Sequence, residues 1–140
     1  MPNFSYVGFM TYEVLGVYLV DFKTNNVGGE MSGKHYALVL SELSKKDSTL
    51  LAAPITSKKA GKKYRGGFTV NCTKYQKNPT YAKAFVKIRK IREISKYRIY
   101  GDKIYDLDKD DVRLLQEAFK NFFSFLNELD DIKIKAEGTI

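Results

Sequence analysis

The chain has 140 residues, of which 44% are hydrophobic and 14% aromatic, and its formal net charge is +8. This length allows one ordinary domain, and the apolar content is sufficient for a packed core, which excludes global disorder. No apolar run reaches the roughly 18 residues that span a bilayer, and residues 1–10 lack the basic and then apolar pattern of a secretory signal. We therefore expect a cytoplasmic protein, a location that also fits the single cysteine, Cys72.

Most of the chain has the character of short β-strands. Residues 14–22 are rich in β-branched and aromatic side chains, which predicts a buried strand. Further strands are expected at 36–41, 49–55 and 68–71 and within 81–94. Asn and Gly mark 23–33 as a loop, 57–67 is a long basic loop, and 95–98 is expected to form a short helical turn.

The C-terminal part changes to a helical pattern. Asp108 can cap a helix, and acids follow it in the first turn. Apolar residues then recur at helical spacing, at Val112, Leu115, Phe119, Phe122, Leu126 and Leu129. Phe123 and Phe125 lie off this stripe and suggest a second buried face, such as a dimer contact. The pattern predicts one domain over residues 1–140: a small closed or half-open β-barrel over about 14–100, then a helix over about 108–129.

Basic residues concentrate in the middle of the chain. Residues 34–98 contain 17 Lys and Arg side chains against 3 acids, whereas both flanking segments are net acidic. A solvated surface is the plain interpretation, but so uneven a distribution favours contact with nucleic acid. Tyrosines interleave with the basic residues, and exposed ones can stack on unpaired bases. We expect RNA contacts from Lys58, Lys62, Lys63, Tyr64, Arg65, Lys87, Arg89 and Lys90.

Two polar clusters stand at the ends of neighbouring strands. Glu30, Lys34 and His35 lie where the second strand begins, and Thr56, Ser57 and Lys59 follow the third. If these strands pair antiparallel, the start of one lies beside the end of the next. The assembled groups would supply proton transfer and cations over phosphate oxygens, as phosphoryl transfer without a metal requires. RNA provides its own nucleophile in the 2′-OH, so no enzyme nucleophile is required. No cofactor is expected.

Other chemistry fits the sequence less well. Residues 28–34 lack the G-x-x-x-x-G-K-[ST] order of a phosphate loop. The acids at 106–111 lack the glycine and final glutamate of a calcium loop, and capping explains them better. With one histidine and one cysteine, no metal-ligand cluster is expected. The alternatives for single residues stay open: Thr56 and Ser57 as a turn or cap, and His35 as a structural side chain.

At these residues the sequence resembles the PemK/MazF superfamily of bacterial toxin endoribonucleases. The resemblance covers residues 14–127 and rests on stretches in family order: 16–22, 28–41, 52–57, 87–94 and the terminal helix. It implies an SH3-like barrel of about five to six strands with a C-terminal helix, usually homodimeric. It also implies sequence-selective, metal-independent cleavage of single-stranded RNA, leaving a 2′,3′-cyclic phosphate and a 5′-OH.

The resemblance carries over to individual residues with one departure. Glu30 matches the family's loop glutamate, and Thr56 its catalytic threonine, with Ser57 following. The family's catalytic arginine falls on His35, and its following proline on Tyr36. Arginine is a permanent cation, whereas histidine ordinarily exchanges protons near neutral pH. We therefore expect general acid or base work from His35 and assign the cationic role to Lys34 or Lys59.

The lysines are also similar to those of the ToxN/AbiQ/CptN-type toxins, the type III branch. Thr56, Ser57 and Lys59 match the Thr-Ser-x-Lys motif of that branch, and Lys34 stands before the second strand. This branch implies neutralisation by a structured RNA antitoxin, which we favour over an acidic protein antitoxin, although the Gly-Gly-Glu loop is closer to the protein-neutralised toxins. Two other functions remain as alternatives. One is a non-catalytic RNA- or DNA-binding barrel, and the other is a protein-targeting toxin similar to gyrase poisons.

Overall fold

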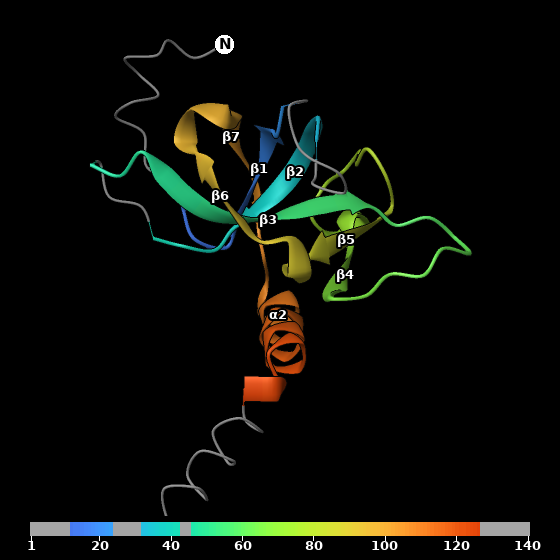
Figure 1. Cartoon of the computed structure of the whole chain (residues 1–140). Coiled ribbons are helices and arrows are strands. Elements are labelled where there is room, and N and C mark those ends of the chain that lie inside the picture. The colour runs from blue at the N-terminus through green and yellow to red at the C-terminus, as the bar shows by residue number, and fades with distance from the viewer. Residues whose placement is uncertain (1–11, 24–31, 43–45, 127–140) are drawn as a thin grey trace, which may run out of the picture.

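The structure, a computed structural model, describes residues 12–23, 32–42 and 46–126 (Figure 1). The described chain forms seven strands, three short 3-10 helices and one α-helix. The strands are β1 (Gly16–Asp21), β2 (Lys34–Val39), β3 (Thr49–Ser57), β4 (Gly67–Asn71), β5 (Lys83–Lys87), β6 (Arg92–Ser95) and β7 (Ile99–Asp106). The helices are η1 (Cys72–Lys74), η2 (Ile88–Lys90), η3 (Lys96–Arg98) and α2 (Lys109–Phe122).

All seven strands belong to one antiparallel sheet. Its order is β4-β5-β3-β2-β1-β7, and β6 pairs with β3 outside this path. One side of β3 is shared: residues 49–52 pair with β6, and residues 55–57 pair with β5. Pro54 lies in the interval between these two partners, where a missing backbone N–H is tolerated. The divided β3 is therefore the strand that joins the two halves of the sheet.

Strand alternation produces two apolar cores on opposite faces of the sheet. The first core contains Val17, Leu38, Ile55 and Val86 and is closed by α2. The second core contains Tyr18, Val20, Phe22, Ala37, Val39 and Ala52, among others. Each of the strands β1, β2 and β3 contributes alternate residues to the two cores, so all three are nearly fully buried at their centres.

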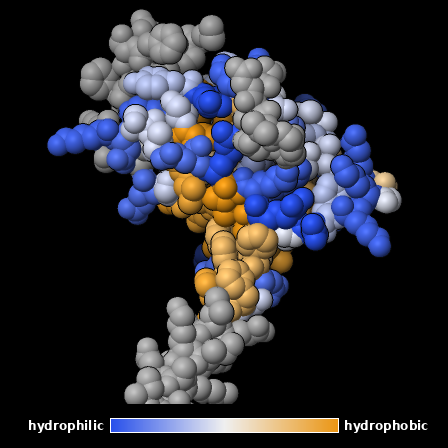
Figure 2. All heavy atoms as spheres, viewed as in Figure 1, coloured by the Kyte–Doolittle hydropathy of each residue, from blue (hydrophilic) through white to orange (hydrophobic). Residues whose placement is uncertain are grey.

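Helix α2 lies below the sheet and contacts β4 (Figure 1). The side chain of Asp108 accepts a hydrogen bond from the backbone N–H of Asp111, as expected of the helix cap. Leu115 and Ala118 are buried against the first core, whereas Phe122 is 40% exposed. Figure 2 shows apolar side chains gathered over this helix. The α-helix ends at Phe122, earlier than expected, and Leu129 lies outside the described residues.

The expected mainly β fold with a C-terminal helix is confirmed. The described residues contain seven strands rather than five or six, because 81–94 is divided by η2 into β5 and β6 and because β7 follows η3. Among the described strands, β7 pairs only with β1, and its Gly101 has a positive φ of 65°. No helix in the described part of the chain is long and apolar enough to cross a membrane.

Candidate active site

The pairing of β2 with β3 brings the two predicted clusters together. Tyr36 is the register partner of Ile55 in this antiparallel pair. The residues one step nearer the strand ends, His35 and Thr56, are therefore neighbours, and both are half-buried. The juxtaposition expected from the order of the strands is thus present in the structure.

A cavity of about 310 Å³ lies at these strand ends. It is lined by Leu19, Lys34, His35, Tyr36, Thr56, Ser57, Thr80 and Tyr81, and we call it the strand-end cavity. Four of the six expected catalytic residues are in this lining. Lys59 is exposed in the loop after β3 and is not among the lining residues. Glu30 lies outside the described residues.

The four residues divide between the two faces of the sheet. Tyr36 packs on the first core and Ala37 belongs to the second, so alternation along β2 places Lys34 with Tyr36 and His35 with Ala37. The His35 ring accordingly lies 6.3 Å from the ring of Phe22, a member of the second core. On β3, the same alternation places Ser57 on the side of the first core and Thr56 on the side of the second.

The imidazole of His35 has a defined hydrogen bond. Its Nε2 atom lies 2.8 Å from the backbone carbonyl oxygen of Ser32. A carbonyl oxygen can only accept, so Nε2 carries the proton in this contact. In the neutral ring Nδ1 is then the nitrogen that can accept a proton, and it is the atom to consider for proton transfer.

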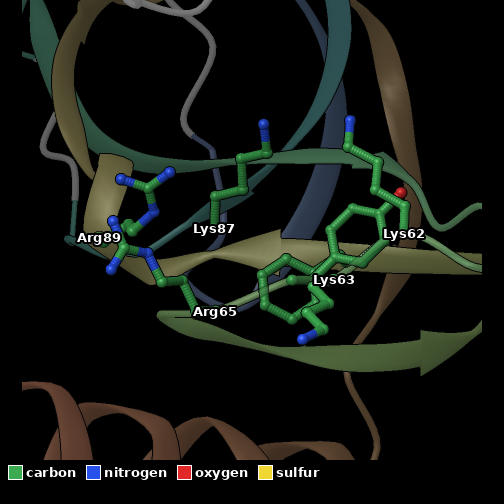
Figure 3. A pocket seen from close by; sticks show the side chains of 7 residues that line it. Lys62, Lys63, Arg65, Lys87 and Arg89 are labelled. Carbon is green, nitrogen blue, oxygen red and sulfur yellow. The ribbon is translucent and has the colours of Figure 1, made fainter.

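The expected RNA-binding residues gather in a second cavity, of about 490 Å³ (Figure 3). We call it the basic pocket; it is lined by Lys62, Lys63, Tyr64, Arg65, Phe85, Lys87 and Arg89. Figure 3 shows Arg65 and Arg89 side by side at one end and Lys62 at the other, with Lys87 between them. Two expected residues are not in this lining: Lys58, whose Nζ donates to Thr69 Oγ1 at 2.6 Å, and Lys90 in η2.

The charges around the basic pocket favour the binding of an anion. Within the described chain, its five cationic side chains form no ion pair with an acid. Burial lowers the pKa of Lys87, and repulsion from Lys90, Lys62 and Arg89 lowers it further. A phosphate group would relieve this repulsion.

Phe85 connects the basic pocket to His35 and Thr56. Phe85 is the register partner of Thr56 on one side and of Thr69 on the other, and residues that are paired across strands share a face. A row of side chains on this face therefore runs from His35 through Thr56 to Phe85. The sequence did not reveal Phe85, because it looks like its core neighbours Ala84 and Val86.

Tyr64 fixes the basic loop against the end of β3. Its hydroxyl donates to the carbonyl oxygen of Ser57 at 3.1 Å and accepts from the N–H of Lys59 at 2.9 Å. Its ring lies 5.1 Å from that of Phe85, and the Lys62 ammonium stands 5.6 Å from its centroid. The loop that supplies Lys62, Lys63 and Arg65 is thereby tied to the strand that supplies Thr56.

The fold is that of MazF toxins, as three solved structures show. The *Deinococcus radiodurans* MazF structure has a TM-score of 0.59 and 20% identity, over 84% of this chain and 98% of that chain. The *Mycobacterium tuberculosis* toxin MazF-mt6 has a TM-score of 0.57 and 17% identity, over 78% and 96%. A mycobacterial endoribonuclease in complex with its cognate antitoxin has a TM-score of 0.55 and 13% identity, over 79% and 93%.

The sequence identifies the family of this chain more specifically than the fold does. Residues 13–123 match the family model described as PemK-like, MazF-like toxin of type II toxin-antitoxin system. The chain therefore belongs to the PemK/MazF-like toxin family, as the sequence resemblance predicted. No curated protein sequence matches it significantly. The type III branch is not the one that the family model describes, so that part of the resemblance stays a prediction.

Proposed function

We propose that this chain is an endoribonuclease toxin that cleaves single-stranded RNA without a metal ion. The observation that supports this most directly is the pairing of β2 with β3, which sets His35 beside Thr56 on the sheet face that continues into the basic pocket. A proton-transfer group, a hydroxyl and a cationic surface then lie along one path. Family membership makes RNA the substrate to test first.

The proposed reaction uses the 2′-OH of the RNA as nucleophile. The 2′-oxygen forms a bond to the adjacent phosphorus, its proton passes to a base, and the bond from phosphorus to the 5′-oxygen breaks. The leaving 5′-oxygen takes a proton from an acid, giving a 2′,3′-cyclic phosphate and a 5′-OH. We assign one of these proton transfers to Nδ1 of His35, and assign to the Thr56 hydroxyl a hydrogen bond to a non-bridging phosphate oxygen.

The remaining roles follow from position. Lys34 lines the strand-end cavity, and its Nζ stands 5.2 Å from the centroid of the Tyr100 ring. Lys59 extends from the loop that Tyr64 holds at the end of β3. Either ammonium is proposed to supply the charge that arginine gives in the family. Glu30 remains the proposed partner for the second proton transfer, and Ser57 a second hydroxyl at the phosphate.

The test is cleavage of a long single-stranded RNA by purified protein, with mapping of the product ends. His35→Gln and Thr56→Val should each lower the cleavage rate by about 100-fold or more, since each removes a group from the reaction centre. Thr73→Val, an exposed threonine in η1, is the matched control. EDTA should leave the rate unchanged.

Three results would contradict the proposal. Cleavage at the normal rate by both site variants would remove His35 and Thr56 from the reaction. Salt-sensitive RNA binding without products would instead favour a binding module. Growth arrest of cells with intact RNA would favour a protein target.

The antitoxin is proposed to be an anionic macromolecule that covers the basic pocket. A structured RNA remains our first expectation because of the surplus of basic side chains over 34–98, and an acidic protein is the alternative. Purification from the native locus, followed by ribonuclease treatment, separates the two. If ribonuclease removes a bound RNA and the protein becomes toxic, an RNA antitoxin is supported. A small acidic protein that co-purifies and appears on a gel would overturn it. A homodimer is a further proposal, tested by the oligomeric state in solution.

A further inference from the structure

The two cavities at the end of β3 differ in chemistry. The basic pocket is bordered by five cationic side chains. The strand-end cavity has walls of Leu19, Tyr36 and Tyr81. Its polar lining consists of Thr56, Ser57, Thr80 and His35, with Lys34 as its one ammonium group. An aromatic wall with a few hydroxyls suits a flat, neutral, hydrogen-bonding group better than it suits a phosphate.

The walls of the strand-end cavity are held in place. The rings of Tyr36 and Tyr81 meet edge to face, with centroids 6.2 Å apart and planes at 73°. Both rings pack on the first core, and the Tyr36 hydroxyl lies 3.1 Å from Thr80 Oγ1. Burial raises the pKa of Tyr81 well above its ordinary value, so its phenol stays neutral. The cavity is thus already formed before any ligand enters it.

The cavity also lies next to the proposed reaction centre. Thr56 and Ser57 are consecutive on β3, and alternation directs them to opposite faces of the sheet. His35 and Thr56 are themselves among the lining residues, so a phosphate that they hold borders the cavity. A volume of about 310 Å³ is at the small end of ligand pockets, which suits one base rather than two.

We propose that the strand-end cavity binds the base of a nucleotide that flanks the cleaved phosphate, and that Thr80, Tyr36 and Tyr81 set the preference of cleavage at that position. The inference rests on the proposed ribonuclease function. Tyr81 and Tyr36 give the base an apolar wall, and the hydroxyl of Thr80 meets its polar edge.

The test compares cleavage preference with cleavage rate. Purified wild-type protein and the variants Thr80→Val and Tyr36→Phe, which keep shape and lose one hydroxyl each, are given a randomised single-stranded RNA library. Sequencing of the new 5′ ends should show a base preference at one position next to the cut. Thr80→Val should reduce that preference roughly 5- to 20-fold, the value of one lost hydrogen bond to the base. Tyr36→Phe removes the hydroxyl that orients Thr80 and should reduce the preference in the same direction. Thr73→Val should leave it unchanged.

A second measurement does not need cleavage. An RNA with 2′-O-methyl groups, which block the nucleophile, carries the fluorescent base 2-aminopurine at successive positions. Stacking on Tyr81 should quench one position in the wild type, and Tyr81→Leu should restore its fluorescence. Equal emission at every position, or quenching that survives in Tyr81→Leu, would overturn the base pocket. So would a wild-type enzyme without preference, or variants with the wild-type preference.

The two hypotheses fail in different ways. If the wild type cleaves RNA but the variants retain its preference, the ribonuclease stands and the base pocket is wrong. If no RNA is cleaved but one 2-aminopurine is quenched in a manner that depends on Tyr81, the base pocket stands and the ribonuclease is wrong. Thermal melts of each variant identify any change that comes from unfolding.

Discussion

Removal of two adjacent charges should change how RNA binding depends on salt. Arg65 and Arg89 lie side by side in the basic pocket, and no described acid forms an ion pair with either (Figure 3). We consider the double variant Arg65→Gln/Arg89→Gln. Glutamine keeps a polar side chain of moderate length, so the change is mainly one of charge.

The magnitude follows from counterion release. Each phosphate that a cation neutralises on a single strand contributes about 0.7 to the slope of log affinity against log salt. If each arginine neutralises one phosphate, the double variant loses about 1.4 from that slope. Its affinity at about 0.1 M salt should then be weaker by about 25-fold, whereas the two proteins should converge near 1 M.

The assay is fluorescence anisotropy with a 2′-O-methylated single-stranded RNA over a series of salt concentrations. The control is Lys109→Gln/Arg113→Gln, which removes the same charge from two exposed positions on α2, outside the pocket lining. A general effect of net charge would lower the slope equally in both double variants. An unchanged slope for Arg65→Gln/Arg89→Gln, or an equal loss at every salt concentration, would refute phosphate binding in the basic pocket.

Other predictions concern the pocket and the support of the helix. Tyr64→Phe removes both hydrogen bonds of the Tyr64 hydroxyl to the end of β3 and should weaken RNA binding several-fold while the melting temperature stays near that of the wild type. The pKa of Lys87 is lowered, so RNA affinity should fall with rising pH before ordinary lysines titrate, and Lys87→Arg should keep its affinity there. Tyr75→Phe removes a hydroxyl that donates to the buried Asp111, and should destabilise the fold by about 1–3 kcal/mol in urea unfolding. The Lys74 ammonium lowers the pKa of Asp108. The contribution of the Asp108 carboxylate to folding stability is therefore complete above the ordinary aspartate pKa and is lost as pH falls through the lower pKa of the folded state. The difference in unfolding free energy between the wild type and Asp108→Asn should therefore disappear in acid.

The meeting of His35 with Thr56 could be predicted because it depends on one local rule. Strands that follow each other through a short connection usually pair antiparallel, so the start of one lies beside the end of the next. The start of the helix was predictable for a similar reason, since Asp108 is a local capping signal. Local signals of this kind do not depend on which face of a strand is buried.

The edge strand β7 and the position of Phe85 in the basic pocket could not be predicted from local signals. In β7, apolar and charged residues come in adjacent pairs around Gly101 and do not alternate, and among the described strands it pairs with β1 alone, so its pattern is weak. β3 and β5 bury both faces at their centres, and a strand that is apolar on both faces carries no alternation. Phe85 could therefore not be distinguished from its core neighbours until the register with Thr56 was known.

The direction of Thr56 and Ser57 to opposite faces of the sheet has a consequence for the proposed ribonuclease. If Thr56 acts at the phosphate, Thr80 at a base and Arg65 along the RNA backbone, their loss should alter rate, preference and salt dependence respectively. These side chains are on β3, on the loop before β5 and on the loop before β4, and within the described chain no hydrogen bond or ion pair links any two of them. Effects of residues without shared partners are close to additive in free energy. The fold-change of a double variant should therefore equal the product of the fold-changes of its two single variants. If the three residues formed one site, the second substitution would have a smaller effect than it has alone.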